Sequence, residues 1–307
     1  MRVVIPLPLA SILAGAALAF SASPARAELR AFSCEPEWAA LAAEIGGDRV
    51  DVYSATTAHQ DVHYIQARPS LISKLRSADL LICSGADLEI GWLPVLLRKA
   101  NNARVQPGQL GHLDVSRIVP MRDVPSNLDR AAGDVHPYGN PHTQTDPHNI
   151  ALVAAELSHR FEQIDPTEAD FYRQRTSEFT DRWKKAIAGW EERGAALRGM
   201  KIITHHVAWT YMAHWLGIEV VGNLEDKPGI PPTAGHLADL LAGLAQQKVA
   251  LIVRATYQSE RPSEWLSRRS GIPAVVIPHS VGATDGAKNL YAMFDDMLDR
   301  LLEARRP

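Results

Sequence analysis

The sequence predicts an α/β protein of two lobes, each a mostly parallel β-sheet covered by helices, with one long rigid helix joining the lobes. Three observations predict this fold. Short apolar runs alternate with helical patterns in the first half of the chain, the same alternation returns in the second half, and a long helical segment lies between the halves. The chain of 307 residues is long enough for two lobes of ordinary domain size.

The first lobe is expected to span residues 28–164. Strands and helices alternate along it, and this βαβ rhythm predicts a parallel sheet with both faces covered. The expected strands are 29–34, 49–54 and 78–83, and the expected helices are 36–45, 69–76 and 92–100.

The second lobe, residues 199–307, repeats the rhythm, so a second parallel sheet is expected. Its expected strands are 201–204, 218–222, 249–254 and 274–277, and its expected helices are 207–215, 233–246, 262–269 and 287–303.

The segment 165–198 predicts the connecting helix. Asp165 and Pro166 form a suitable cap and first-turn pair. Neither glycine nor proline interrupts residues 167–188. Apolar residues recur near the helical period at Phe171, Phe179, Trp183, Ile187 and Trp190. We therefore expect one helix of about 20 to 30 residues that holds the lobes apart rigidly.

The loop 123–145 differs in composition from its surroundings. It contains three prolines, two glycines and several polar residues, and it carries His136 and His142. Such a segment is expected to be exposed and mobile.

The first 27 residues have the features of a secretory signal peptide. Arg2 makes the N-terminal region positively charged, an apolar run follows, and Ala25-Arg26-Ala27 resembles a cleavage site. An uncleaved N-terminal helix is the alternative. We expect cleavage after Ala27 and a periplasmic location for the mature chain.

The chain has two cysteines, Cys34 and Cys83, and each ends an expected strand. Because an exported protein meets an oxidising compartment, an even number of cysteines favours one disulfide bond. Two buried free thiols are the alternative.

The overall composition, 46% hydrophobic and 22% charged residues, is that of a soluble globular protein. The formal net charge of −3 gives no support for nucleic-acid binding, which favours a basic surface.

Several of the twelve histidines stand where a strand or loop meets the start of a helix. His63, His142 and His206 have this position, and the loop after the last strand adds His279 and Asp285. Ligands usually bind at that edge of a parallel α/β sheet. Three neutral imidazoles and one further donor suit tetrahedral zinc. The pattern predicts a metal site in the cleft between the lobes, although for any single histidine a surface or hydrogen-bonded role is the alternative.

Sequence motifs that would indicate an enzyme are weaker than the metal-site pattern. His59 and His63 have the spacing of the two zinc ligands in a protease helix, but Gln60 replaces the general-base glutamate. Ser280 lacks the glycines of a nucleophile elbow. No glycine-rich phosphate loop is present.

Longer motifs resemble the zinc/manganese solute-binding proteins of bacterial ABC importers, over nearly the whole mature chain. These motifs are QDVHYIQARPS from Gln60, ADLLICSGADLE from Ala78, GDVHPYGNPH from Gly133, HVAWTY from His206 and KPGIPP from Lys227. Two of them, GDVHPYGNPH and KPGIPP, resemble a zinc branch of the family.

The resemblance implies two α/β lobes joined by one long helix, and His63, His142 and His206 as metal ligands. The fourth ligand in many relatives is an acidic residue after the last strand, so Asp285 is expected to coordinate. The alternatives are His279 or water as the fourth ligand, with Asp285 serving only in a turn.

The remaining histidines are not at motif positions. His136 and His148 could capture the ion first, with a surface role as the alternative, and the roles of His59 and His205 are open. Arg254 stands where relatives often carry glutamate, and its role is open.

The predicted function is therefore capture of Zn(II) as a transported ligand, without catalysis, by a monomer that delivers the ion to the membrane permease of an ABC importer. A periplasmic metallochaperone is a second candidate partner. Manganese or iron binding in the same fold, a periplasmic zinc enzyme and a zinc store are the alternatives.

Overall fold

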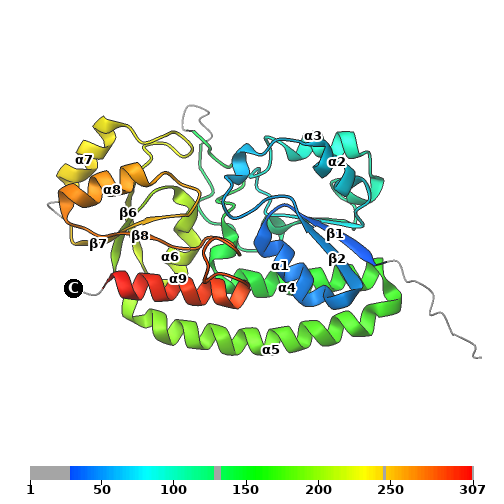
Figure 1. The fold of residues 1–307 in the computed structure, drawn as a ribbon. Helices are drawn as coiled ribbons and strands as arrows, with labels where there is room; N and C mark the ends of the chain where they lie inside the picture. The colour runs from blue at the N-terminus through cyan, green and yellow to red at the C-terminus, as the bar shows by residue number, and fades with distance from the viewer. Residues whose placement is uncertain (1–27, 128–132, 245–246, 306–307) are drawn as a thin grey trace, which may run out of the picture.

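The computed structural model describes residues 28–127, 133–244 and 247–305, and it has two lobes side by side above one long helix (Figure 1). The expected signal peptide, residues 1–27, lies outside the described residues. Within the described ranges, no helix has the length and apolar character needed to cross a membrane. The structure confirms the predicted two-lobed α/β fold.

Each lobe is built on a four-stranded, wholly parallel sheet. The strand orders are β2-β1-β3-β4 in the N-terminal lobe and β6-β5-β7-β8 in the C-terminal lobe, so the two sheets have the same topology. The strands are β1 Leu29–Ser33, β2 Val50–Ser54, β3 Leu80–Cys83, β4 His112–Asp114, β5 Lys201–Thr204, β6 Glu219–Asn223, β7 Val249–Arg254 and β8 Ala274–Val276. Strand β4 was not expected, because it has only three residues and its sequence has no alternating apolar pattern.

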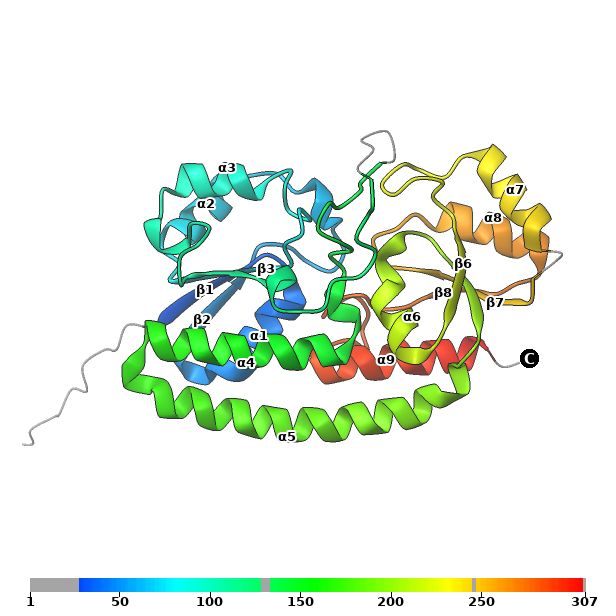
Figure 2. The same cartoon turned by 180° about the vertical axis from the view of Figure 1, so that it is seen from behind.

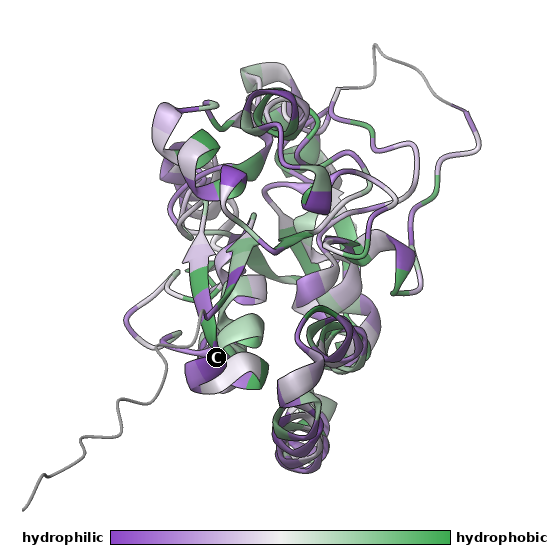
Figure 3. Ribbon diagram, turned by 90° about the vertical axis from the view of Figure 1, so that its right-hand side faces the viewer, coloured by the Kyte–Doolittle hydropathy of each residue, from purple (hydrophilic) through white to green (hydrophobic). Residues whose placement is uncertain are grey.

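Helices cover both faces of each sheet (Figures 1 and 2). Helices α2 and α3 lie above the first sheet, with α1 and α4 below it, while α7 and α8 lie above the second sheet, with α6 and α9 below it. Their bounds are α1 Pro36–Gly46, α2 Pro69–Arg76, α3 Leu93–Ala100, α4 Pro147–Ile164, α6 Thr210–Leu216, α7 Ala234–Leu244, α8 Glu260–Ser270 and α9 Leu290–Ala304. Viewed from the end, hydrophobic residues lie mainly on the strands and hydrophilic residues mainly on the outer helices (Figure 3).

The helices of the N-terminal lobe begin at prolines. Each of α1 to α4 has a proline in its first two positions, where the missing backbone N–H is not needed. Asp146 also caps α4 by accepting a hydrogen bond from the backbone N–H of His148.

The connecting helix α5, Ala169–Gly194, has 26 residues and runs beneath both lobes (Figures 1 and 2). It is shorter than the expected span of 165–198, because single 3-10 turns at Pro166–Glu168 and Ala195–Leu197 replace its two ends. It contacts α1 and α4 in the first lobe and α9 in the second.

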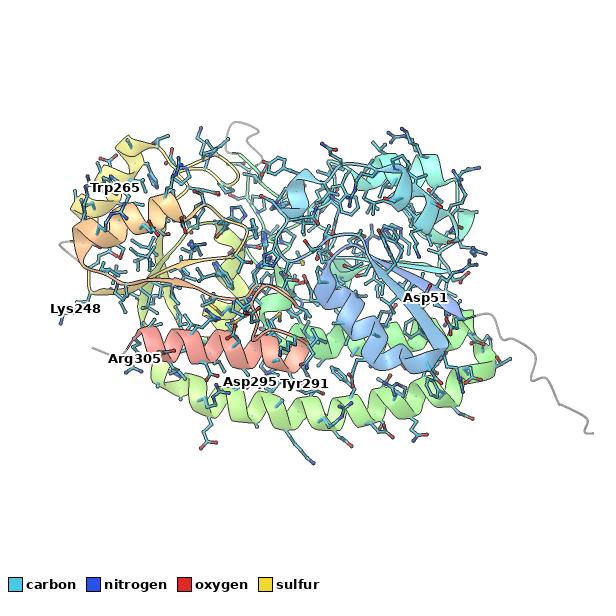
Figure 4. The ribbon with its side chains drawn as sticks, viewed as in Figure 1. Asp51, Lys248, Trp265, Tyr291, Asp295 and Arg305 are labelled. Atoms are coloured by element: carbon cyan, nitrogen blue, oxygen red, sulfur yellow. A yellow bond between two sulfur atoms is a disulfide. The ribbon has the colours of Figure 1, made fainter. Side chains whose placement is uncertain are left out.

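An aromatic seam fixes α5 to the C-terminal lobe. Trp183 contacts Tyr291 with ring centroids 4.8 Å apart, and Trp190 contacts Phe294 at 4.9 Å. The indole N–H of Trp190 donates to Asp295 at 2.9 Å. Figure 4 labels Tyr291 and Asp295 on the side of α9 that faces α5. Because buried aromatic rings contribute large apolar area, this seam holds the lobe in a fixed position on the connector.

The loop 123–145 is not exposed throughout, contrary to expectation. Residues 128–132 lie outside the described residues, but 139–145 are buried. The side-chain amide of Asn140 donates to Asp123 at 3.1 Å and to the carbonyl of Val207 at 2.7 Å, and the hydroxyl of Tyr211 donates to the carbonyl of Asn140 at 2.8 Å. These bonds fix the end of the loop between the lobes.

A disulfide bond joins Cys34 to Cys83, with their Cα atoms 4.9 Å apart. The parallel pairing of β1 with β3 places the two strand ends side by side, and the backbone N–H of Cys34 donates to the carbonyl of Ile82 at 2.8 Å. The predicted disulfide is therefore present in the structure.

Glu37 forms a polar contact between the lobes. This side chain of α1 is 1% exposed and accepts a hydrogen bond from the hydroxyl of Ser280, which follows β8 in the other lobe. Burial raises the pKa of Glu37 to about 7, and the bond from Ser280 only partly opposes this. Glu35 and Glu89 are also buried, and burial raises the pKa of Glu89 to about 7 as well.

The disulfide should contribute strongly to stability. It closes a loop with a sequence separation of 49 residues. We expect the variant Cys34→Ala/Cys83→Ala to lose about 4 kcal/mol of unfolding free energy, from the entropy of loop closure in the unfolded chain. Urea unfolding of both proteins measures the difference. A loss below about 1 kcal/mol would contradict the expectation.

Replacing Glu37 by glutamine should change how stability depends on pH. The folded chain keeps the Glu37 proton up to about pH 7, above the ordinary value of 4.5. Between these values the unfolded chain binds fewer protons, so stability falls as pH rises. Glu37→Gln should be more stable than wild type at pH 8, by at most about 3 kcal/mol, with little gain at pH 5.

Urea unfolding of the metal-free protein at both pH values tests this. Glu178→Gln, at an exposed position of α5, is the matched control and should follow wild type. Equal pH dependence in wild type and Glu37→Gln would refute the role assigned to this carboxyl group.

Candidate metal centre

Three of the four expected ligands converge between the lobes. His63, His142 and His206 each offer a ring nitrogen, and these atoms all lie within 4.8 Å of one another. The ring centroids are 5.3 to 5.7 Å apart. Each lobe contributes to the cluster, so the group exists only when both lobes are in place.

The positions of these histidines follow from the parallel sheets. His63 lies in a 3-10 turn, Val62–Tyr64, in the connection that leaves the carboxyl end of β2. His206 follows the end of β5 and precedes the 3-10 turn Val207–Trp209. His142 directly precedes the short turn Thr143–Thr145 that leads into α4. The carboxyl edges of the sheets thus face the cleft, as expected for a ligand site.

An oxygen acceptor holds the Nδ1 atom of each ring. The distances are 2.7 Å from His63 to Asp61, 2.9 Å from His142 to Asn140 and 2.7 Å from His206 to Glu225. The amide nitrogen of Asn140 is already used by Asp123 and Val207, so its oxygen faces His142. Such oxygen partners commonly orient histidines that bind metals.

These partners determine which ring nitrogen is free. Because the acceptors require a proton on Nδ1, the neutral rings carry a bare lone pair on Nε2. The Nε2 atom of His206 is buried and has no hydrogen-bond partner in the described structure. A buried polar atom without a partner is costly, and a bound cation would satisfy it.

Burial keeps the imidazole ring of His142 neutral. His142 is 5% exposed, and desolvation together with the neighbouring histidines lowers its pKa well below the usual value. Burial alone would raise the pKa of Asp61, but hydrogen bonds from His63 outweigh it, so this pKa is lowered and the carboxylate stays charged. The site therefore combines a neutral nitrogen donor with a nearby negative charge.

Another imidazole, that of His136, lies beside His63, with ring centroids 5.3 Å apart. Its Nε2 is 3.3 Å from the Nε2 of His63, and its Nδ1 is 3.1 Å from the carbonyl oxygen of Ala86. Burial and the nearby His63 lower the pKa of His136 to about 4. The sequence suggested only a capture or surface role for this residue.

The structure does not bring Asp285 to the histidines. Asp285 is exposed and lines neither of the two cavities that border the cluster. The end of its loop is fixed elsewhere, because Thr284 donates to Asp296 of α9 at 2.6 Å and the backbone of Gly282 donates to Ala287 at 2.7 Å. His279 of this loop is buried instead, and it lines a cavity with His63 and His142.

The other histidines lie outside the cluster. His59 is exposed, and His148 lies on the surface of α4, where its ring contacts Asp146 and Glu191. His205 is buried, with its Nε2 3.8 Å from Glu225. Arg254 lies 3.7 Å from Glu260 and donates to the carbonyl of Gln258, so its charge is paired locally.

An acidic cavity of about 300 Å³ borders the cluster on the side of the C-terminal lobe. Asp61, Asp134 and Glu225 line it, together with His63 and His206. Carboxylates around such an opening attract cations and raise their local concentration.

A local sequence pattern could have identified part of this arrangement. Asp61-x-His63 and Asn140-x-His142 share an aspartate or asparagine two residues before the histidine, and in each the side-chain oxygen also accepts from the histidine backbone at 3.1 Å. Asp146-x-His148 has the same geometry on the surface, so the pattern orients a ring without creating a site. Glu225 is 19 residues from His206, and no local signal joins them.

Comparison with known proteins agrees with this architecture. A family model described as zinc-uptake complex component A, periplasmic, matches residues 33–304. A crystal structure of ZnuA superposes with a TM-score of 0.75 at 18% identity, covering 91% of this chain and all of the other. A Mn-bound periplasmic metal-binding protein from Candidatus Liberibacter asiaticus superposes with a TM-score of 0.73 at 16% identity, with the same coverage.

Relatives of similar sequence are named for different metals. The manganese ABC transporter substrate-binding lipoprotein PsaA of Streptococcus pneumoniae is 23% identical over 84% of this chain and 83% of its own. The iron-binding protein YfeA of Yersinia pestis is 23% identical over 75% and 70%, and the zinc-binding lipoprotein AdcA of S. pneumoniae is 18% identical over 76% and 46%. The chain belongs to the periplasmic zinc-uptake component A family, and it is a metal-binding component of an ABC importer rather than an enzyme.

Proposed function

We propose that this protein captures Zn(II) in the periplasm through His63, His142 and His206 and delivers it to the membrane permease of an ABC importer. The observation that carries the proposal is the convergence of three ring nitrogens, each oriented by an oxygen partner on the opposite nitrogen. The ion is cargo in this proposal, and no reaction is involved.

The donor set favours zinc over manganese. Imidazole nitrogens suit zinc, whereas manganese prefers carboxylate, carbonyl and water oxygens. Asp61 and Glu225 are engaged with histidine Nδ1 atoms and serve to orient the rings. The expected carboxylate, Asp285, is exposed and lines neither cavity beside the histidines, so the described structure gives no support for an oxygen-rich site.

Export is part of the proposal. The residues that precede Glu28 have the features of a cleavable signal peptide, with cleavage after Ala27. A monomeric state and a metallochaperone partner stay predictions from the sequence.

Competition titration of the purified mature protein tests the metal. We expect zinc to displace manganese, with zinc also found by elemental analysis of protein isolated from the periplasm. His206→Ala should lose more than about 100-fold in zinc affinity, since loss of an orienting partner alone costs about 10- to 100-fold. His148→Ala, which removes a surface histidine of the same lobe as His142, is the matched control and should bind as wild type. Preferential loading with manganese or iron, or an unchanged His206→Ala, would defeat the proposal.

The partner of His206 should also affect affinity. Glu225 accepts from both the His206 ring and the backbone N–H of Gly229. In Glu225→Gln a single carbonyl oxygen replaces the two carboxylate oxygens, so we expect zinc affinity to fall by about tenfold. Glu219→Gln, at an exposed position of β6, is the control. Equal affinity in Glu225→Gln and wild type would show that this orientation is not needed.

A further inference from the structure

We infer that reduction of the disulfide between Cys34 and Cys83 creates a second metal site, in which the two thiolates and the carboxylate of Glu89 bind a thiolate-preferring divalent ion such as Zn(II). This site lies in the N-terminal lobe, shares no residue with the histidine cluster and goes beyond the proposed function. Three features support it: the convergence of the donor atoms, the buried carboxyl groups beside the disulfide, and a cavity that reaches it.

The three donor atoms already converge. The two Sγ atoms and a carboxylate oxygen of Glu89 all lie within 4.8 Å of one another. With Zn–S and Zn–O bonds of about 2.3 and 2.1 Å, the ligand atoms of one tetrahedral zinc ion lie about 3.6 to 3.8 Å apart. The Cα atoms of Cys34 and Cys83 are 4.9 Å apart, so rotation of the side chains can bring the sulfurs to this spacing once their bond is broken.

The fold fixes the positions of these residues. Strands β1 and β3 pair in parallel, so Cys34 and Cys83 lie at the carboxyl edge of the first sheet, where ligands usually bind. A turn after β3 returns the chain to the disulfide, and its residues 85–87 all have positive φ, between 51° and 76°. The backbone N–H of Gly85 donates to the carboxylate of Glu89 at 3.2 Å. Non-glycine residues rarely adopt positive φ, and such conformations occur often at functional sites.

Two buried carboxyl groups lie beside the disulfide. Glu89 and Glu35 are 3% and 2% exposed. Glu35 follows Cys34 in the chain, and its Oε2 atom accepts from the backbone N–H and the hydroxyl of Ser84, at 3.2 and 3.1 Å. Its Oε1 atom is buried and has no hydrogen-bond partner within the described residues. A disulfide offers no hydrogen to such oxygens, whereas a cation bound at the cysteines would offset the cost of burying them.

A cavity of about 530 Å³ reaches the cysteine pair. Cys83 and Glu89 line it, and the acidic residues Asp87 and Asp114 outnumber Arg117 in its wall. Negative charge around such an opening attracts cations. The cavity therefore gives a small dithiol and a metal ion a route to Cys83.

The reduction balances with a dithiol as the reductant. One thiolate of the dithiol attacks the Sγ atom of Cys83, forms a mixed disulfide with it and releases Cys34 as a thiolate. The second thiolate of the reductant then closes the reductant's own disulfide and releases Cys83. Two electrons pass to the protein, and the two protons of the dithiol end on the cysteines. Each cysteine loses this proton when it binds the ion.

Cobalt titration tests the inference. The metal-free mature protein is reduced with dithiothreitol, freed of the reagent without air and titrated with Co(II) to saturation. Thiolate ligands give a sulfur-to-cobalt charge-transfer band, which histidine and carboxylate ligands do not give. We expect the reduced protein to show this band and to bind one equivalent of cobalt more than the oxidised protein. The oxidised protein and reduced Cys34→Ser/Cys83→Ser should show no band, and far-UV circular dichroism measures whether each sample is folded.

Glu89→Gln distinguishes a formed site from two free thiols. We expect the cobalt affinity read from the charge-transfer band to fall by at least about tenfold, because loss of a ligand should cost no less than loss of an orienting partner. Asp51→Asn, at an exposed position of β2, is the matched control and should bind as wild type.

Three results would overturn the inference: no charge-transfer band in the folded, reduced protein, equal cobalt affinity in Glu89→Gln and wild type, or unfolding of the protein on reduction in the presence of cobalt. None of them affects the proposed function, since the histidines are unchanged in every sample.

Discussion

The fixed orientation of the imidazole rings is the constraint on which the proposed site depends. A histidine can rotate about two bonds, and only one range of angles aims Nε2 at the centre. The oxygens of Asp61, Asn140 and Glu225 select that range for the three converging rings. Because these partners lie in different parts of the chain, the site needs both lobes in one relative position.

The helical layer beneath the sheets supplies that position. Helix α5 has 26 residues and is bound to the first lobe through α1 and α4 and to the second through α9. The contacts of Trp183 and Trp190 with α9 are buried and aromatic, which makes sliding of the second lobe along the connector costly. The disulfide between Cys34 and Cys83 joins the carboxyl ends of β1 and β3, at the edge of the first sheet that faces the cleft and close to the turn at Gly85.

Sequence patterns predicted the architecture well because its signals are local. Apolar runs, prolines at helix starts and an uninterrupted helical period are each read within a few residues. The same holds for His63 and His206, which follow the carboxyl ends of β2 and β5, and for His142, which precedes the turn into α4. Asp285 stays a prediction as a ligand: it is exposed in this metal-free structure, where its neighbour Thr284 donates to Asp296 of a helix further along the chain. Glu225 was missed as the partner of His206, because its position comes from contacts with His206 and Gly229 that no spacing in the sequence reveals.

The burial of the rings has a consequence for how cargo leaves. Desolvation keeps His142 neutral well below the ordinary histidine range, and the pKa of His136 lies at about 4. Mild acid therefore leaves these two imidazoles neutral, since burial opposes their protonation. In the proposed function, separation of the lobes would release the ion, because each lobe contributes histidines to the cluster. Binding and lobe closure are reciprocally coupled: the free energy that the aligned lobes add to ion binding equals the free energy that the bound ion adds to the closed arrangement. Opening the lobes of the loaded protein therefore costs more free energy than opening those of the metal-free protein, and the importer would have to supply that difference.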